Sequence, residues 1–216
     1  MDRADPLCGL CQRLHPPFEK AVAYGSYDGG LRDLIHLLKY QQVRPAAGVL
    51  GRILAETITR LEATLPPGLI TVVPVPLHVQ KRAQRGFNQS ELIVRAALKQ
   101  LARPERFQTM IGLLVRRRET GSQIGLTRHQ RRENLRGAFA VADPALLAER
   151  DILLVDDVFT TGTTAAECAR VLRRAGAKRV WVATVARTLK ISEIFVVPEQ
   201  GHSEESLHHL AAAANS

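Results

Sequence analysis

The sequence has few aromatic residues, few cysteines and no long apolar run, and each shortage argues against a class of protein. Phe, Trp and Tyr make up 5% of the 216 residues and do not interleave with the basic runs, which argues against a platform that stacks single-stranded bases. Three cysteines, an odd number, do not make a disulfide framework. Apolar stretches such as 69–77 are too short to span a bilayer, and the first residues lack an apolar signal core. We therefore expect a cytoplasmic protein with no membrane span.

Positive charge is in excess along the chain. Lys and Arg number 30 against 21 Asp and Glu, and the formal net charge is +9. Such a surplus implies an anionic partner: a nucleic acid, a phosphorylated metabolite or an acidic protein. The basic residues gather in two runs, 81–85 and 116–136. Hydrophobic residues at 45% are typical of a globular protein, and the length allows one α/β domain with an appendage.

Apolar periodicity predicts strands and helices that alternate along the chain. Strands are expected at 70–75, 111–115, 138–141, 152–155 and 180–185, and helices over 31–38, 50–61, 92–101 and 163–174. Asn88 or Ser90 is a candidate cap for the third helix, and Gly176 is placed to end the fourth. This alternation predicts an α/β fold with a doubly wound, mainly parallel sheet.

One segment, 151–164, combines a buried strand, two carboxylates and a loop of small residues. Asp156 and Asp157 follow the apolar run 152–155, and the small residues 160–164 lead into a helix. A helix N-terminus with nearby hydroxyl groups suits a phosphate. The carboxylates would repel a phosphate, so their natural partners are sugar hydroxyls or a hard cation such as Mg²⁺. A structural strand end with a threonine cap explains one Asp and one Thr only. The pattern therefore predicts a site for a phosphorylated sugar.

This segment resembles the phosphoribosyl pyrophosphate (PRPP) motif of type I phosphoribosyltransferases. The resemblance implies Mg²⁺ as the cofactor that accompanies PRPP, and it makes Asp156 and Asp157 the catalytic-site carboxylates that hold the ribose hydroxyls. It also implies a loop that binds the 5′-phosphate, formed by Val158, Thr160, Thr161, Gly162, Thr163 and Thr164.

A second segment, 72–90, reads as a strand, a polar loop over 78–87 with three basic residues, and the start of a helix. In a parallel sheet this loop opens at the same edge as the acidic pair, where guanidinium groups can bind phosphate. A solvated basic loop is the alternative. The order Pro-Val-Pro, basic residues, Arg-Gly-Phe-Asn-Gln resembles the ComF family of phosphoribosyltransferase-like proteins, which is associated with natural competence. That resemblance implies a pyrophosphate loop formed by Pro76, Leu77, Lys81, Arg82, Arg85, Gly86, Asn88 and Gln89.

The arginine-rich segment 116–137 also resembles ComF proteins, in its Gln-x-x-Leu, Arg-x-x-Asn and Gly-Ala-Phe pattern. Type I enzymes carry a mobile loop at this place that closes over PRPP and excludes water. The resemblance implies a flexible lid with Arg116, Gln123, Arg131 and Asn134. A solvated helix face or a nucleic-acid contact remains open as an alternative.

The two ends of the chain differ from the central region. Cys8 and Cys11 have the spacing of a zinc knuckle, but a structural zinc site needs four ligands, so the expected site is an incomplete remnant. Segment 27–40 also matches ComF proteins; it is either a hood that selects the second substrate or an ordinary amphipathic helix with Lys39 solvated. We expect a truncated Cys-x-x-Cys segment at 1–23, a phosphoribosyltransferase-like domain at 24–187 and a poorly ordered tail at 188–216.

Three functions follow from these patterns. The first is a phosphoribosyltransferase that displaces pyrophosphate from PRPP in the presence of Mg²⁺, with a possible link to DNA uptake and the competence machinery. The second is a non-catalytic accessory protein that binds single-stranded DNA through the arginine stretch. The third is hydrolysis or salvage of a purine or pyrimidine base. Salt dependence separates the second from the first, because contacts from several arginines to phosphates weaken steeply with salt.

Overall fold

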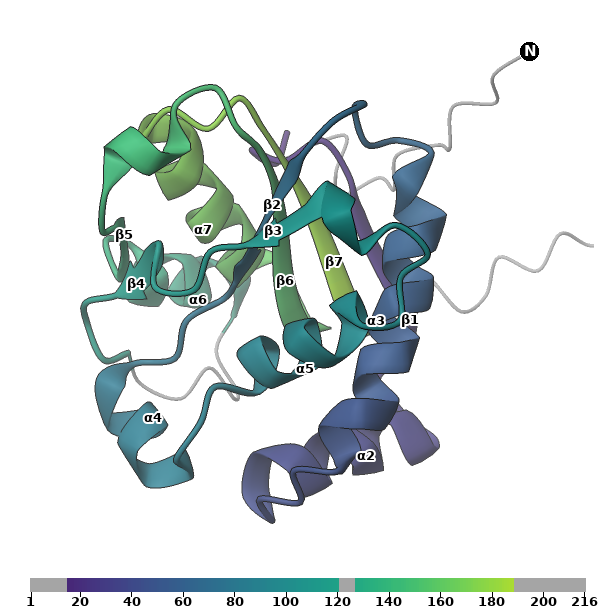
Figure 1. Cartoon of the computed structure of the whole chain (residues 1–216). Coiled ribbons are helices and arrows are strands. Elements are labelled where there is room, and N and C mark those ends of the chain that lie inside the picture. Colours follow the sequence, from purple (N-terminus) through teal and green to yellow (C-terminus); the bar gives the residue numbers. More distant parts are fainter. Residues whose placement is uncertain (1–14, 121–126, 189–216) are drawn as a thin grey trace, which may run out of the picture.

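The computed structural model describes residues 15–120 and 127–188, which form a parallel β-sheet covered by helices (Figure 1). The main sheet has five strands in the order β1-β7-β6-β2-β3, and every neighbouring pair is parallel. The strands are β1 (Ala21–Ser26), β2 (Ile70–Pro74), β3 (Phe107–Thr109), β6 (Asp151–Phe159) and β7 (Arg179–Arg187). The predicted α/β fold with a mainly parallel sheet is confirmed.

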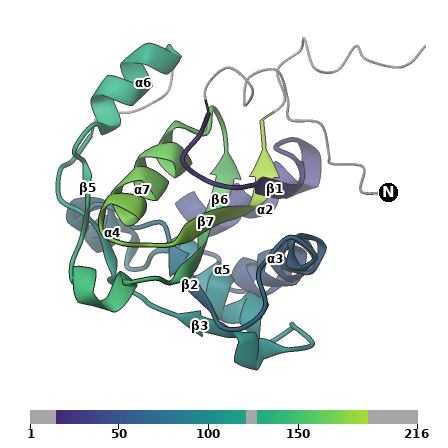
Figure 2. The same cartoon turned by 90° about the horizontal axis from the view of Figure 1, so that it is seen from above.

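Helices cover the two faces of this sheet as separate layers. Figure 2 shows α7 (Thr163–Arg174) and α6 (Arg128–Leu135) on one side of the strands, and α3 (Ala46–Glu62) and α5 (Gln89–Leu98) on the other. Helix α2 (Gly29–Tyr40) packs against α3. The chain leaves β2 toward the outer strand β3, whereas it leaves β6 in the opposite direction, toward β7. The carboxyl ends of β2 and β6 therefore meet at a topological switch point, where open α/β sheets bind ligands.

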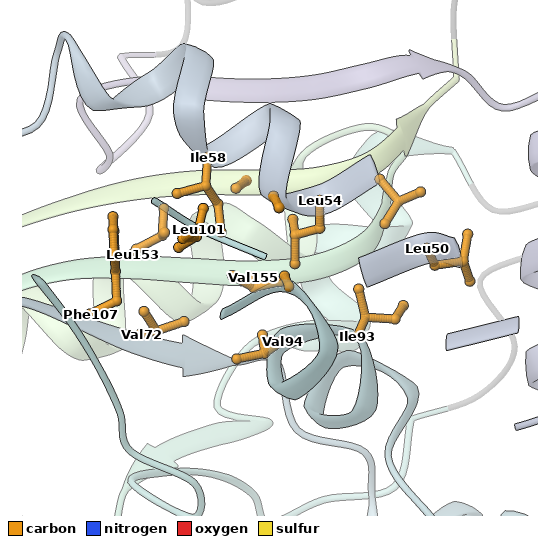
Figure 3. Packing of buried hydrophobic residues seen from close by; sticks show 14 of the residues in the cluster. Leu50, Leu54, Ile58, Val72, Ile93, Val94, Leu101, Phe107, Leu153 and Val155 are labelled. Carbon is orange, nitrogen blue, oxygen red and sulfur yellow. The ribbon is translucent and has the colours of Figure 1, made fainter. Parts of the chain in front are cut away.

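Each layer has its own apolar core. On one face, Leu50, Leu54 and Ile58 of α3 and Ile93 and Val94 of α5 pack over alternate strand residues, as the labelled side chains in Figure 3 show. On the other face, Ala165, Cys168 and Leu172 of α7 pack over Ile152 and Leu154. Strand side chains alternate between the two faces, which is why both helix layers find an apolar surface on the same five strands.

Helix α7 begins and ends as its sequence predicts. It starts at Thr163, directly after Gly162. At its other end the amide of Ala177 donates to Leu172 O at 3.1 Å and that of Gly176 donates to Arg173 O at 3.2 Å. These two bonds make a Schellman motif with Gly176 at the C′ position, at a φ of 105°.

The structure differs from the expected elements at both sides of the sheet. Strand β3 and strand β1 are absent from the prediction, and the expected domain boundary at residue 23 falls inside β1. Phe18 is already buried, and the amide of Glu19 donates to Val180 O at 2.8 Å, so the domain begins before β1. The expected strand 111–115 is displaced: β4 (Leu114–Arg116) pairs antiparallel with β5 (Phe139–Val141) in a separate two-stranded sheet.

The expected polar loop 78–87 is also wrong in part, because a short helix, α4 (Val79–Arg85), occupies it. Gly86 ends this helix in the left-handed conformation, and its amide donates to Arg82 O at 2.8 Å. Asn88 then caps α5 by accepting from the amide of Ser90 at 3.0 Å, as one of the two predicted caps. The basic residues of this segment therefore stand on a helical turn with fixed directions.

Candidate functional site

The candidate site lies where β6 and β2 end side by side. The register places Pro74 beside Val155, and the amide of Val75 donates to Val155 O at 2.8 Å. The acidic pair continues directly from this point along β6, and the chain leaves β2 toward α4 and α5. Two of the sequence-predicted segments are therefore adjacent in space, as parallel pairing of their strands requires.

The two carboxylates are held by the strand and by the start of α5. The backbone amide of Asp157 donates to Oδ1 of Asp156 at 2.9 Å, and Ser90 Oγ donates to the same atom at 3.3 Å. Asp157 is 4% exposed, whereas Asp156 is partly exposed. Among the described residues, no hydrogen bond reaches the buried Oδ2 of Asp157. One buried acceptor at the end of β6 therefore has its hydrogen-bonding capacity unused.

A lysine from α2, the hood helix, forms an ion pair with one of these two carboxylates. Lys39 Nζ of α2 donates to Oδ1 of Asp157 at 2.8 Å, and its side chain is 17% exposed. The alternative in which Lys39 is solvated is therefore wrong. The sequence carries a signal for this position, because Lys39 stands four residues after Ile35, on the buried stripe of its helix. A charged residue on an apolar stripe needs a buried partner, and Asp157 is that partner.

Burial and the crowding of charge shift the pKa values of this group. Burial first, and the Asp157 carboxylate second, raise the pKa of Asp156 to about 7. Burial alone would lower the pKa of Lys39, but attraction to Asp157 outweighs it, so that pKa is raised. Burial also raises the pKa of Tyr27, against the opposing effect of Lys39. At neutral pH the cluster of Asp156, Asp157 and Lys39 therefore carries less negative charge than two free carboxylates would.

The loop after β6 has the predicted composition at the start of a helix. No side chain caps α7, so the first amides of the helix, beginning with Thr163, lack intrahelical partners. Thr161 and Thr163 share a hydrogen bond between their hydroxyls at 2.7 Å, and both lie beside Gly162. Gly162 has a φ of 73°, and a Cβ there would lie 2.6 Å from the ring of Phe159. Only glycine fits this turn, which brings the backbone close to any group bound at the helix end.

The basic residues of the predicted pyrophosphate loop are partly engaged within the protein. Arg82 binds both oxygens of Glu91 at 2.9 and 3.2 Å, which satisfies the guanidinium that we expected to face an anion. Arg85 donates to Gln89 Oε1 at 2.5 Å and lies over the ring of Tyr40. Lys81 is partly exposed, Gly86 is exposed, and Pro76 and Leu77 lead into α4. Of the three basic residues only Arg82 has an acidic partner, and Lys81 makes no hydrogen bond or ion pair within residues 15–120 and 127–188.

The predicted lid residues occupy three different places. Arg116 lies in β4 over the ring of Phe139 and contacts the Thr120 hydroxyl, so it belongs to a strand and not to a loop. Arg131 of α6 reaches Thr160 Oγ1 at 3.4 Å. Asn134 lies on the same helix, and its carbonyl accepts from Arg118 at 2.8 Å. Gln123, Cys8 and Cys11 lie outside the described residues.

The carboxylates fit a divalent cation only when a ligand supplies further oxygen atoms. Asp157 already binds an ammonium group, and Asp156 has one oxygen engaged by Ser90 and by the backbone. Over residues 15–120 and 127–188, no group of three or more His, Cys, Asp or Glu residues is arranged to hold a metal. Mg²⁺ is commonly bound by one or two carboxylates together with phosphate oxygens, and this donor set suits that mode.

A hollow of about 530 Å³ lies elsewhere, lined by Leu65, by residues 67–69 and by Arg103, Glu105 and Arg106. It borders the residues that precede β2, at the opposite end of this strand from the acidic pair. Glu62 binds both arginines, at 3.3 and 3.2 Å. The two arginines that line the hollow are therefore paired with a neighbouring carboxylate.

Known proteins match this chain over most of its length. A family model described as "Phosphoribosyl transferase domain" matches residues 90–193. The "DNA utilization protein YhgH" of Escherichia coli (strain K12) is 36% identical over 183 residues, which are 84% of this chain and 78% of that protein. "Competence protein F" of Haemophilus influenzae is 33% identical over 185 residues, 83% of this chain and 78% of that protein.

The fold, together with the domain match over residues 90–193, is that of a phosphoribosyltransferase-like protein of type I. Within that class, the chain belongs to the ComF family, as the similarity to these two relatives shows. A solved glutamine PRPP amidotransferase from Bacillus subtilis, complexed with ADP and GMP, covers 66% of this chain at 22% identity with a TM-score of 0.40; the match spans 26% of that enzyme. In the part of the chain that the structure describes, no helix is long and apolar enough to cross a membrane.

Proposed function

We propose that this protein binds PRPP with Mg²⁺ at the end of β6 and transfers its phosphoribosyl group with release of pyrophosphate. One observation carries the proposal: a buried carboxylate with an unused acceptor stands at the end of a strand that runs directly into an uncapped helix N-terminus lined by threonine hydroxyls. A sugar that carries a phosphate offers hydroxyl donors to the carboxylate and an anion to the helix N-terminus.

Different residues of the chain bind different parts of the ligand. Asp157 Oδ2 accepts a ribose hydroxyl, and the partly exposed Asp156 accepts a second hydroxyl or shares a metal with the ligand. The loop 160–164 and the first amides of α7 bind the 5′-phosphate. Lys81, which lies on α4, binds the pyrophosphate. Mg²⁺, when bound with PRPP, neutralises charge on the leaving pyrophosphate. Binding and orientation of this kind supply much of the acceleration in such transfers.

Replacing Thr161 with valine should weaken PRPP binding roughly 10- to 100-fold, because one hydrogen bond to a charged phosphate is worth about 1.5–3 kcal/mol. Calorimetric titration of PRPP, with and without Mg²⁺, measures this. Thr59→Val is the matched control, since Thr59 is exposed and its hydroxyl bonds only within α3, to Ala55 O at 2.9 Å. Equal affinity of the Thr161 variant and the wild type would show that the phosphate binds elsewhere.

A second candidate function is nucleic-acid binding, and it is supported by an arginine cluster on α6 and α7. Burial first, then repulsion from Arg174, Arg132 and Arg136, lowers the pKa of Arg170. These four arginines therefore lie close together on one surface. Arg132, Arg136 and Arg174 are exposed there. Two relatives are named for DNA utilization and for competence. A surface of mutually repelling arginines suits a polyanion such as single-stranded DNA.

Changing Arg132, Arg136 and Arg174 together to glutamine should flatten the salt dependence of single-stranded DNA binding. Each lost phosphate contact lowers the slope of log K against log salt concentration by about 0.7, so the slope should fall by about 2. Fluorescence anisotropy over a range of salt concentrations gives this slope. The control replaces Arg52, Arg95 and Lys99, which are exposed on α3 and α5 or at the end of α5, on the other face of the sheet. An unchanged slope in the first variant rules out the cluster as the DNA surface.

A further inference from the structure

Lys39 reaches a carboxylate that lies 118 residues away in the sequence. Its helix, α2, packs on α3 at the outside of the sheet, yet the ammonium group lies at Asp157 with a side chain only 17% exposed. Tyr27 lies close enough to both charges that each one influences the pKa of its hydroxyl. The hood helix therefore contributes a fixed positive charge to the site, and not just an apolar cover.

This ammonium group occupies the coordination space that a metal would need. It lies 2.8 Å from Oδ1 of Asp157, whereas Mg²⁺ binds carboxylate oxygens at about 2.0–2.1 Å. A divalent cation on the same oxygen would lie next to a like charge, in a site of reduced dielectric constant, so the two exclude each other. The second oxygen of Asp157 is buried and receives no hydrogen bond from the described residues. Its capacity to accept a hydrogen bond is therefore unused.

We propose that Lys39 is a resident cation that takes the place of a metal at Asp157, so that the ribose end of the ligand binds without a divalent cation. Mg²⁺ then enters only with the pyrophosphate. The inference rests on the proposed function of the same site. It assigns Lys39 as a positioning residue: the ammonium holds Oδ1 of Asp157 through the ion pair, while Oδ2 is left to accept the sugar hydroxyl. A purely structural ion pair would affect stability but not the metal requirement.

The experiment is a titration of ribose 5-phosphate and of PRPP into the full chain, each in EDTA and in millimolar Mg²⁺. In the wild type, the affinity for ribose 5-phosphate should be equal within about twofold in the two buffers. In Lys39→Met, the affinity in EDTA should fall at least tenfold and Mg²⁺ should restore it, because the metal then has access to Asp157. Lys39→Arg keeps the charge and should keep the metal independence. Lys99→Met, an exposed lysine at the end of α5, is the matched control.

A second readout does not need the sugar. Mg²⁺ alone should raise the melting temperature of Lys39→Met by several degrees and leave that of the wild type unchanged, since ligands that bind only the folded state stabilise it. The inference is overturned if wild-type binding of ribose 5-phosphate needs Mg²⁺, or if Mg²⁺ stabilises both proteins equally. If neither sugar binds to any variant in either buffer, the proposed function fails and this inference fails with it; a metal requirement in the wild type overturns the inference alone.

Discussion

Gly51→Ala is expected to destabilise the protein by at least about 2 kcal/mol, even though alanine is the better helix former. Helices α3 and α5 cross so closely at this residue that an added Cβ would lie 2.4 Å from Ala96 Cβ and 2.9 Å from the Ala96 carbonyl carbon. One of these contacts is with backbone, so no side-chain rotation relieves it. The helices must separate, which loosens the apolar layer that Leu50 and Ile93 complete (Figure 3).

Gly48→Ala is the matched control in the same helix. A Cβ at Gly48 meets nothing within 4 Å, and the residue is exposed. That substitution should raise stability by about 0.5–1 kcal/mol through helix propensity alone. Chemical denaturation measures both variants, and a difference of about 2–4 °C in melting temperature per kcal/mol is expected for a domain of this size. Equal stabilisation by both substitutions would show that α3 and α5 are farther apart than described.

Asp156→Asn should make the protein more stable at alkaline pH while it removes a ligand-binding carboxylate. The folded state raises the pKa of Asp156 to about 7, from an ordinary value of 3.8. Each unit of pKa corresponds to about 1.4 kcal/mol, so ionisation of this carboxyl opposes folding by an amount on the order of 4 kcal/mol. Asparagine keeps the acceptor that Ser90 and the Asp157 amide use, and it carries no charge.

The direction with pH follows from linkage. Because the folded state holds the proton more tightly than the unfolded state, wild-type stability is highest below about pH 4 as far as this group is concerned, and it falls as pH rises toward 7. The advantage of the variant should therefore be near zero at about pH 4 and largest at about pH 8. Asp143→Asn is the matched control, because it makes the same chemical change at an exposed cap that asparagine also fills. If the stability advantage of Asp156→Asn does not change with pH, ionisation of Asp156 does not oppose folding.

Much of the fold is predictable because strong apolar runs alternate with helical stripes. The strand 152–155 and the helix 163–174 are confirmed, and parallel pairing of β2 with β6 brings their predicted loops together. Strand β3, only three residues long, carries too little pattern to detect. Strand β1 has a mixed burial pattern because it is an edge strand, so its apolar alternation is weak.

Side-chain partners were less predictable than strands, since they depend on distances across the fold. The Asp156–Asp157 motif and its threonine loop are visible in the sequence, but the ion pair with Lys39 joins residues from the two ends of the domain. The basic residues 81–85 are predicted to meet an anion, yet Glu91 lies in the first turn of the next helix and binds Arg82. Local sequence reveals which groups are charged; only the packing of α2, α4 and α5 reveals which charges are already paired.

The pairing of β1 with β7 has a consequence for how the protein is made. These strands are the first and the last of the sheet, and Ala21 is in register with Val182 (Figure 1). During synthesis β7, the partner of β1, emerges from the ribosome after nearly the whole domain. Until then β1 has no neighbouring strand, and the helices that follow it lack part of the sheet on which they pack. Lys39 likewise cannot form its ion pair until Asp157 has been synthesised. Nascent chains of this protein should therefore depend on chaperones until β7 is released, and the site should form in the last step of folding.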